Sequence, residues 1–136
     1  MTKVVATGVF AIIHPGHILY LKEARKLGDE LTVIVARDCM VEKRKKHIVP
    51  ENQRLAVVKA LRVVDKAILG DMRDIFNPIK KINPDIIALG VNQHFNIRDL
   101  ETQLRERGLE AKVVRVHKHW DSELNSSKKI VRRIRG

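Results

Sequence analysis

The sequence contains a single cysteine, Cys39, so no disulfide can form within the chain. Aromatic residues make up only 4% of it, which leaves few of the stacking platforms that bind single-stranded nucleic acid. No apolar run approaches the length of a membrane-spanning helix, and the chain opens on a strand-like segment rather than a secretion signal. These absences predict a cytoplasmic protein with neither a membrane nor a nucleic acid as its partner.

Acidic residues are scarce relative to basic ones, 16 Asp and Glu against 27 Lys and Arg, which gives a formal net charge of +11. This charge fits nucleic acid, an acidic membrane surface or a polyanionic small molecule. The basic residues are spread along the chain, with the densest groups at Lys43–Lys46 and after Lys128. A solvated surface explains part of the charge. The spread favours a phosphate-rich small molecule, and non-enzymatic binding of nucleic acid is the weakest alternative.

Strand-like and helix-like segments alternate along the 136 residues. This length and pattern predict a single domain that comprises residues 1–136. The expected strands are Lys3–Thr7, Leu31–Ala36, Lys66–Leu69, Asp85–Leu89 and Ala111–Val116. The expected helices are Pro15–Lys26, Glu51–Arg62, Met72–Ile82, Ile97–Arg107 and Ser126–Ile134, with a late start or a kink of the third at Pro78. The pattern predicts an α/β fold, a Rossmann-like doubly wound sheet of five parallel strands.

Polar and titratable residues follow these strands, where parallel sheets of this kind bind their ligands. The segments after the strands contain His14 and His17, Arg37-Asp38, Asn92-Gln93-His94, and 117–127. The ligand site is therefore expected at the carboxyl edge of the sheet.

The sequence His14-Pro15-Gly16-His17 lies between the first strand and the first helix. Gly16 allows the backbone to approach a ligand closely, and the free N–H groups of a helix start bind phosphate. A metal site needs three or four ligands, and the chain has neither a cysteine pair nor a His-Glu-x-x-His pattern. The two histidines are therefore predicted to contact phosphates, and no metal-ligating residue is predicted.

Two further groups could bind anions. The first comprises Arg37, Lys43, Lys46 and Arg54, although a solvated basic loop is the favoured explanation when these residues are taken alone. The second, Ser126-Ser127-Lys128-Lys129-Ile130, opens the last helix, and capping alone would account for its serines. Two helix N-termini in one cleft would nevertheless suit a triphosphate.

These residues resemble the cytidylyltransferase-like nucleotidyltransferase superfamily, whose pattern is Thr-Gly-x-Phe-Asp, His-x-Gly-His and a later Ser-[Ser/Thr]-x-Lys-Ile. The corresponding stretches here are Thr7–Ala11, His14–His17 and Ser126–Ile130. Within the superfamily, the chain is most similar to archaeal-type FAD synthases, and glycerol-3-phosphate cytidylyltransferases are near relatives. The stretches that carry this similarity are Val35–Asp38, Val41–Lys45, Val64–Ala67 and Pro84–Gly90.

The resemblance implies that the FMN phosphate attacks the α-phosphate of ATP and displaces pyrophosphate, without a covalent enzyme intermediate. It implies that His14 and His17, with Lys43 and Arg54, act on the phosphates. The nucleotide site would further include Thr7, Gly8, Val9, Phe10, Gly16, Asn92, Ser126, Ser127 and Lys129. Mg²⁺ or another divalent cation would bind through the nucleotide phosphates, and a homodimer is expected. The alternative is a cytidylyltransferase that uses CTP and glycerol 3-phosphate or a similar phosphorylated alcohol.

The chain departs from the family pattern at three positions. Ala11 stands where the family usually has an acidic residue, and Asn92 where Asp is usual. Asn125 precedes the serines where FAD synthases often carry cysteine.

Overall fold

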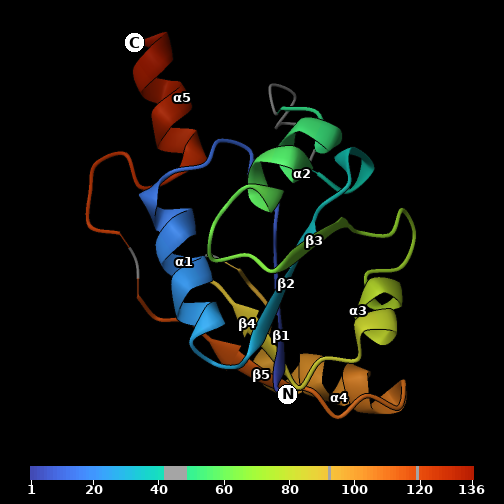
Figure 1. Cartoon of the computed structure of the whole chain (residues 1–136). Helices are drawn as coiled ribbons and strands as arrows, with labels where there is room; N and C mark the ends of the chain where they lie inside the picture. The colour runs from blue at the N-terminus through green and yellow to red at the C-terminus, as the bar shows by residue number, and fades with distance from the viewer. Residues whose placement is uncertain (42–48, 92, 119) are drawn as a thin grey trace.

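A five-stranded parallel sheet forms the centre of the molecule, in the strand order β3-β2-β1-β4-β5 (Figure 1). The computed structural model describes residues 1–41, 49–91, 93–118 and 120–136. The strands are β1 (Lys3–Gly8), β2 (Glu30–Val35), β3 (Lys66–Leu69), β4 (Ile86–Leu89) and β5 (Lys112–Arg115). The helices are α1 (Pro15–Arg25), α2 (Glu51–Lys59), α3 (Phe76–Ile82), α4 (Ile97–Glu106) and α5 (Ser127–Arg135), with a 3-10 turn, η1, at Asp38–Met40.

Strand β1 lies at the middle of the sheet, where Val5 is in register with Thr32 of β2 and Ile87 of β4. Val4, Val5 and Ala6 are all fully buried. A central parallel strand is covered on both faces, which explains why its sequence is continuously apolar rather than alternating. The predicted doubly wound α/β fold is confirmed.

Helices cover the sheet in two layers, each with its own apolar core (Figure 1). On one face, Leu21 of α1 and Val58 of α2 pack with Val4 and Val33 of the sheet. On the other face, α3 and α4 pack against Val5 and against the strand side chains that alternate with those of the first core. This second core also includes Ile34, Phe76, Ile79, Ile87, Leu89, Leu100 and Leu104.

Helix α3 begins at Phe76, four residues after the first residue of the predicted span, Met72. The Asp71 carboxylate accepts hydrogen bonds from the backbone N–H groups of Arg73 and Asp74, which hold the preceding segment in a turn. Pro78 therefore falls in the first helical turn, where its missing N–H costs no helical hydrogen bond. The predicted late start is confirmed.

Among the described residues, no helix is both long and apolar enough to span a bilayer. Helix α5 extends away from the sheet and carries the C-terminus at its far end (Figure 1). Its N-terminus, in contrast, lies against the loop between β1 and α1, because Ser127 is hydrogen-bonded to Ile12. The N-termini of α1 and α5 are thereby brought to the same edge of the sheet.

Candidate active site

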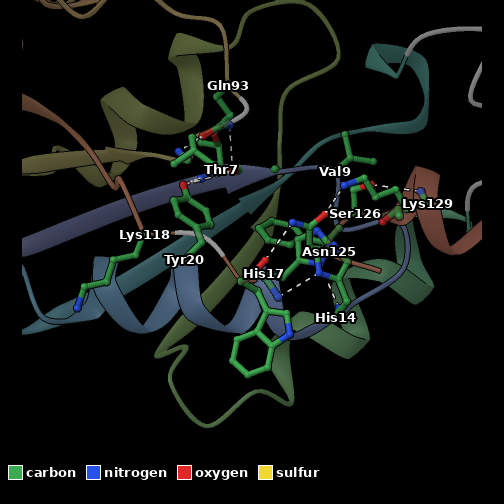
Figure 2. A pocket seen from close by; sticks show the side chains of 17 residues that line it. Thr7, Val9, His14, His17, Tyr20, Gln93, Lys118, Asn125, Ser126 and Lys129 are labelled. Carbon is green, nitrogen blue, oxygen red and sulfur yellow. Dashed lines mark hydrogen bonds between the residues drawn. The ribbon is translucent and has the colours of Figure 1, made fainter. Parts of the chain in front are cut away.

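A cavity of about 590 Å³ opens at the carboxyl end of β1, between the N-termini of α1 and α5 (Figure 2). It brings together most of the site residues predicted from the sequence. Those that line it are Thr7, Gly8, Val9, Phe10, His14, Gly16, His17, Ser126, Ser127 and Lys129. Lys43 and Asn92 lie outside the described residues. Lys46 also lies outside them, and Arg37 and Arg54 do not line the cavity.

Two backbone hydrogen bonds at the start of α1 hold the rings of the two histidines in place. The Gly16 N–H donates to Nδ1 of His14 at 3.0 Å, and the His14 N–H donates to Nδ1 of His17 at 3.2 Å. Since each Nδ1 accepts a hydrogen bond, the neutral rings carry their protons on Nε2. Each ring is therefore left with an N–H that can donate to an anion.

Burial disfavours the charged form of both rings. Desolvation by burial, together with repulsion from His14, lowers the pKa of His17 to about 4. Burial likewise lowers the pKa of His14. The ring centroids lie only 3.9 Å apart, so two imidazolium charges would repel each other strongly. At neutral pH the pair can therefore act as uncharged hydrogen-bond donors through Nε2.

Two glycines make this packing possible. A Cβ at Gly16 would lie 2.7 Å from the His14 ring, and one at Gly8 would lie 2.9 Å from the Phe10 ring. Phe10 itself is buried and adopts a left-handed backbone conformation, with φ 53°. For a non-glycine residue this conformation is strained, and such strain is often found at functional sites. The centroid of the Phe10 ring lies 5.4 Å from that of the His17 ring, so the phenyl ring packs beside the imidazole.

The start of α5 forms the opposite wall of the cavity. The Ser126 hydroxyl caps the helix by accepting a hydrogen bond from the Lys129 N–H at 3.2 Å. The Lys129 ammonium donates to Oδ1 of Asn125 at 2.9 Å, which holds this charge beside the helix N-terminus. Ser126 therefore caps α5, as the sequence indicated. The same end of the helix also faces the cavity, where its N–H groups can bind an anion.

Several lining residues were not among the predicted site residues. They are Tyr20, Gly90, Val91, Gln93, Lys118, Trp120 and Asn125. Tyr20 donates from its buried hydroxyl to the Ala88 carbonyl oxygen at 2.6 Å. Gln93 donates to the Thr7 hydroxyl at 3.0 Å and accepts from the Gly90 N–H at 2.7 Å. Both side chains join the carboxyl ends of β1 and β4, and Figure 2 shows them beside Thr7.

A signal for Tyr20 was present in the sequence. Tyr20 lies three positions after His17, so the two side chains share one face of α1. Burial raises the pKa of the Tyr20 phenol well above its ordinary value, so the hydroxyl stays protonated and can serve as a fixed donor. For Trp120 the only signal was its position after the last strand.

Arg54 is 2% exposed, and its guanidinium donates four hydrogen bonds to protein acceptors. Its Nη1 bridges the carbonyl oxygens of Val9 and Ala36, each at 2.8 Å, and Nη2 donates to Asp38 at 2.6 Å. Nε donates to the Val49 carbonyl oxygen at 2.7 Å. The expectation that Arg54 contacts substrate phosphates directly is therefore not met in this structure. Its guanidinium instead holds the backbone that forms the floor of the cavity.

The charge of the cavity suits an anion. None of the described lining residues is Asp or Glu, whereas Lys118 and Lys129 contribute ammonium groups. Lys118 is paired with Glu23 at 2.8 Å, and this pairing lowers the pKa of the Glu23 carboxyl. Two helix N-termini and two imidazole Nε2–H groups add further donors. The arrangement can hold several phosphate oxygens and can stabilise negative charge that develops on one of them.

Comparison with known proteins gives consistent matches over nearly the whole chain. The cytidylyltransferase-like family matches residues 5–133. An FAD synthase of Archaeoglobus profundus is 59% identical over 134 residues, which cover 98% of this chain and 86% of that protein. An FAD synthase of Methanocella paludicola is 56% identical over 99% of this chain and 97% of its own. The crystal structure of a lipopolysaccharide core biosynthesis protein from Thermoplasma volcanium superimposes with a TM-score of 0.83 at 46% identity, covering 89% of this chain and 99% of that chain.

Proposed function

This chain belongs to the cytidylyltransferase-like family, and on that premise we propose that it is an FAD synthase, which transfers AMP from ATP to FMN. The relatives that share half or more of its residues act as FAD synthases, and the chain spans most of their length. The observation in the structure that carries the proposal is the cavity itself. It gathers two histidines and two helix N-termini, a set of donors that suits the phosphates of a nucleoside triphosphate.

In this reaction a phosphate oxygen of FMN forms a bond to the α-phosphorus of ATP. The bond between that phosphorus and the oxygen that bridges to the β-phosphate breaks, and pyrophosphate leaves with the electron pair. The side chains of the protein form no covalent bond to either substrate. Catalysis then consists of holding the two anions in line and stabilising the charge that builds on the leaving group.

The residues divide this work according to their positions. On the analogy with the family, His17 is assigned to the phosphoryl group that is transferred, and His14 to its neighbour. Ser126, Ser127 and Lys129, at the start of α5, are assigned to the β- and γ-phosphates. Thr7, Gly8, Val9 and Phe10 form the floor beneath the nucleotide. Arg54 is assigned a positioning role through Val9, since its donors are bound to the protein.

A divalent cation, Mg²⁺, is expected to enter with the nucleotide. Among the described residues, no group of three or more His, Cys, Asp or Glu side chains could hold a metal ion. The donors of the cavity therefore suit phosphate oxygens rather than a metal. Mg²⁺ commonly binds through substrate phosphates and water, and there it neutralises part of the phosphate charge. The side chains at the starts of α1 and α5 would hold phosphate oxygens of the same nucleotide.

The test is to incubate the purified protein with FMN, ATP and Mg²⁺ and to separate the products by chromatography. Formation of FAD and pyrophosphate in equal amounts is the expected result. The parallel incubation contains CTP and glycerol 3-phosphate. Consumption of that pair without any FAD from the first incubation would instead identify a cytidylyltransferase.

The homodimer, the cytoplasmic location and the single domain stay predictions. Light scattering on the purified protein checks whether it is a homodimer.

A further inference from the structure

Arg115, the last residue of β5, holds the connection between β4 and α4 beside the cavity at the starts of α1 and α5 (the phosphate-binding cavity). It is in register with Leu89, the last residue of β4, and its side chain is half-buried. Its Nη1 donates to the carbonyl oxygens of Gly90, at 3.2 Å, and Gln93, at 2.6 Å. Its Nη2 donates to the carbonyl oxygen of Phe95 at 2.6 Å. One guanidinium thus joins three backbone carbonyl groups of the same connection.

These acceptors match the shape of a guanidinium. A guanidinium carries five N–H donors in a planar fork, whereas a lysine ammonium is a compact point charge on a flexible stem. Two of the three bonds are as short as 2.6 Å, and hydrogen bonds from a charged donor are stronger than neutral ones. The position of the connection therefore depends on the shape of the Arg115 side chain and not only on its charge.

Gln93 carries the effect of this contact into the cavity. While the Gln93 backbone is bound by Arg115, its side-chain amide donates to the Thr7 hydroxyl at 3.0 Å and accepts from the Gly90 N–H at 2.7 Å. Thr7, Gly90 and Gln93 all line the phosphate-binding cavity, and Figure 2 shows Gln93 beside Thr7. Arg115 does not line it. The guanidinium therefore fixes one wall of the cavity from behind, through hydrogen bonds that reach from β5 to the end of β1.

We propose that Arg115 is a positioning residue for the nucleotide, an inference that rests on the proposed function because that function places a nucleoside triphosphate in this cavity. Arg115 holds the connection between β4 and α4 in the one position in which Gln93 completes the wall. Without the guanidinium, the connection spends part of its time in other positions. The apparent Kd of a ligand rises in inverse proportion to the fraction of protein in the competent conformation. Arg115 thus sets the affinity for the nucleotide without contacting it.

The experiment measures the Kd of ATP by titration calorimetry in the presence of Mg²⁺ and without FMN. Arg115→Met removes both the fork and the charge, and Arg115→Lys removes the fork alone. Each should raise the Kd by about tenfold, as when the competent position is occupied about a tenth of the time. Arg98→Met is the matched control, because Arg98 is exposed on α4 and does not line the cavity. A wild-type Kd in Arg115→Lys would show that charge alone matters and would overturn the inference.

A double-mutant cycle tests whether Arg115 acts through Gln93. Gln93→Ala should also raise the Kd of ATP, and adding Arg115→Met to it should raise the Kd little further, because both changes disturb one network. Fold-changes that multiply would mean that the two residues act independently, against the inference. A purely structural role would lower the melting temperature and leave the Kd of the folded protein unchanged. Melting curves verify folding, and Arg115→Lys replaces Arg115→Met in the cycle if the latter does not fold.

The outcomes separate this inference from the proposed function, because the Kd of ATP is measured without turnover. If wild type forms FAD while both Arg115 variants bind ATP as wild type does, the inference is wrong and the proposed function stands. If wild type binds ATP and both variants bind it more weakly, the inference holds even where no FAD forms, and only the proposed function fails. If wild type does not bind ATP, the inference is overturned.

Discussion

The hydroxyl of Ser127 forms two hydrogen bonds with the backbone of Ile12, accepting from its N–H at 3.2 Å and donating to its carbonyl oxygen at 3.1 Å. These bonds join the first residue of α5 to the loop that leads from β1 into α1. The two residues are 115 positions apart in the sequence. Through this contact, the two helix N-termini that face the cavity are held in a fixed relation to each other.

Ser127→Ala should therefore weaken ATP binding without unfolding the protein. A hydrogen bond of this kind contributes about 1 kcal/mol, which corresponds to a roughly fivefold higher KM for ATP. Ser122→Ala is the matched control, because the Ser122 hydroxyl accepts only a local bond from the Leu124 N–H at 3.2 Å. Steady-state kinetics at saturating FMN measure the effect. An unchanged KM for ATP in Ser127→Ala would show that the Ser127–Ile12 contact takes no part in positioning α5 for the triphosphate.

His17→Ala should lower kcat on the order of 10²-fold, as expected when one preorganised donor to the transition state is removed. The fold should survive, because the imidazole lies at a helix start beside a cavity. His94→Ala, at an exposed position outside the cavity, is the control. Turnover of FMN and ATP measures kcat, and circular dichroism measures folding. Normal turnover in a folded His17→Ala protein would exclude His17 from the chemistry.

The stability of the protein should fall as the pH falls from about 6.5 to about 4. In this window the unfolded state binds a proton at His17, whose ordinary pKa is 6.5, while the folded state resists it because its pKa is about 4. The unfolded state then binds more protons, and the free energy of unfolding decreases with decreasing pH. The lowered pKa of His14 acts in the same direction.

Urea unfolding at pH 7.5 and at pH 4.5 measures this loss. His17→Gln removes the titrating group, so the variant should lose less stability between the two pH values than wild type does. His94→Gln serves as the matched substitution at an exposed position. An equal loss in wild type and His17→Gln would mean that His17 titrates at its ordinary pKa in the folded protein.

The order of strands and helices was predictable because each element carries a local signal. Continuous apolar runs marked buried strands such as β2, and Pro15 and Gly28 bounded α1. The start of α1 at Pro15 and the N-cap of α5 at Ser126 were also predictable from local sequence, whereas the capping role of His14 was not predicted.

What could not be predicted were contacts between residues distant in the sequence. Arg54 illustrates this limit, because a basic residue one turn into a helix gives no sign that it will be buried against Val9 and Ala36. Gln93 lies after a strand and was noticed only as part of a polar segment. Its bonds to Thr7, across 86 positions, follow from the pairing of β1 with β4. Sequence pattern located the edge of the sheet, and tertiary packing decided which side chains face the cavity.

Arg54→Lys should destabilise the protein by about 2 kcal/mol or more, although the positive charge is kept. A lysine ammonium cannot bridge two carbonyl oxygens and also reach Asp38, so buried acceptors lose their partners, at about 1–3 kcal/mol each. Movement of Val9 should also lower kcat. Urea unfolding compares the variant with Arg62→Lys, whose arginine is exposed. Wild-type stability in Arg54→Lys would show that the bridging bonds contribute little.

The only tryptophan of the chain provides a direct probe of nucleotide binding. Trp120 lines the phosphate-binding cavity, yet 44% of its surface is exposed, and Asn125 donates a hydrogen bond to its carbonyl oxygen at 3.0 Å. An indole in this position can stack on a purine, and stacking of a base on an aromatic side chain contributes about 1–3 kcal/mol. ATP should therefore change the tryptophan emission.

Tripolyphosphate, which has the phosphates of ATP but no base, should leave that emission nearly unchanged while competing with ATP for the site. Trp120→Ala should raise the Kd of ATP by about tenfold and leave the Kd of tripolyphosphate as it is. If tripolyphosphate and ATP change the emission equally, Trp120 responds to the phosphates through the Asn125–Lys129 contact rather than to the base. The base would then lie against another part of the cavity, and Trp120→Ala would bind both ligands as wild type does.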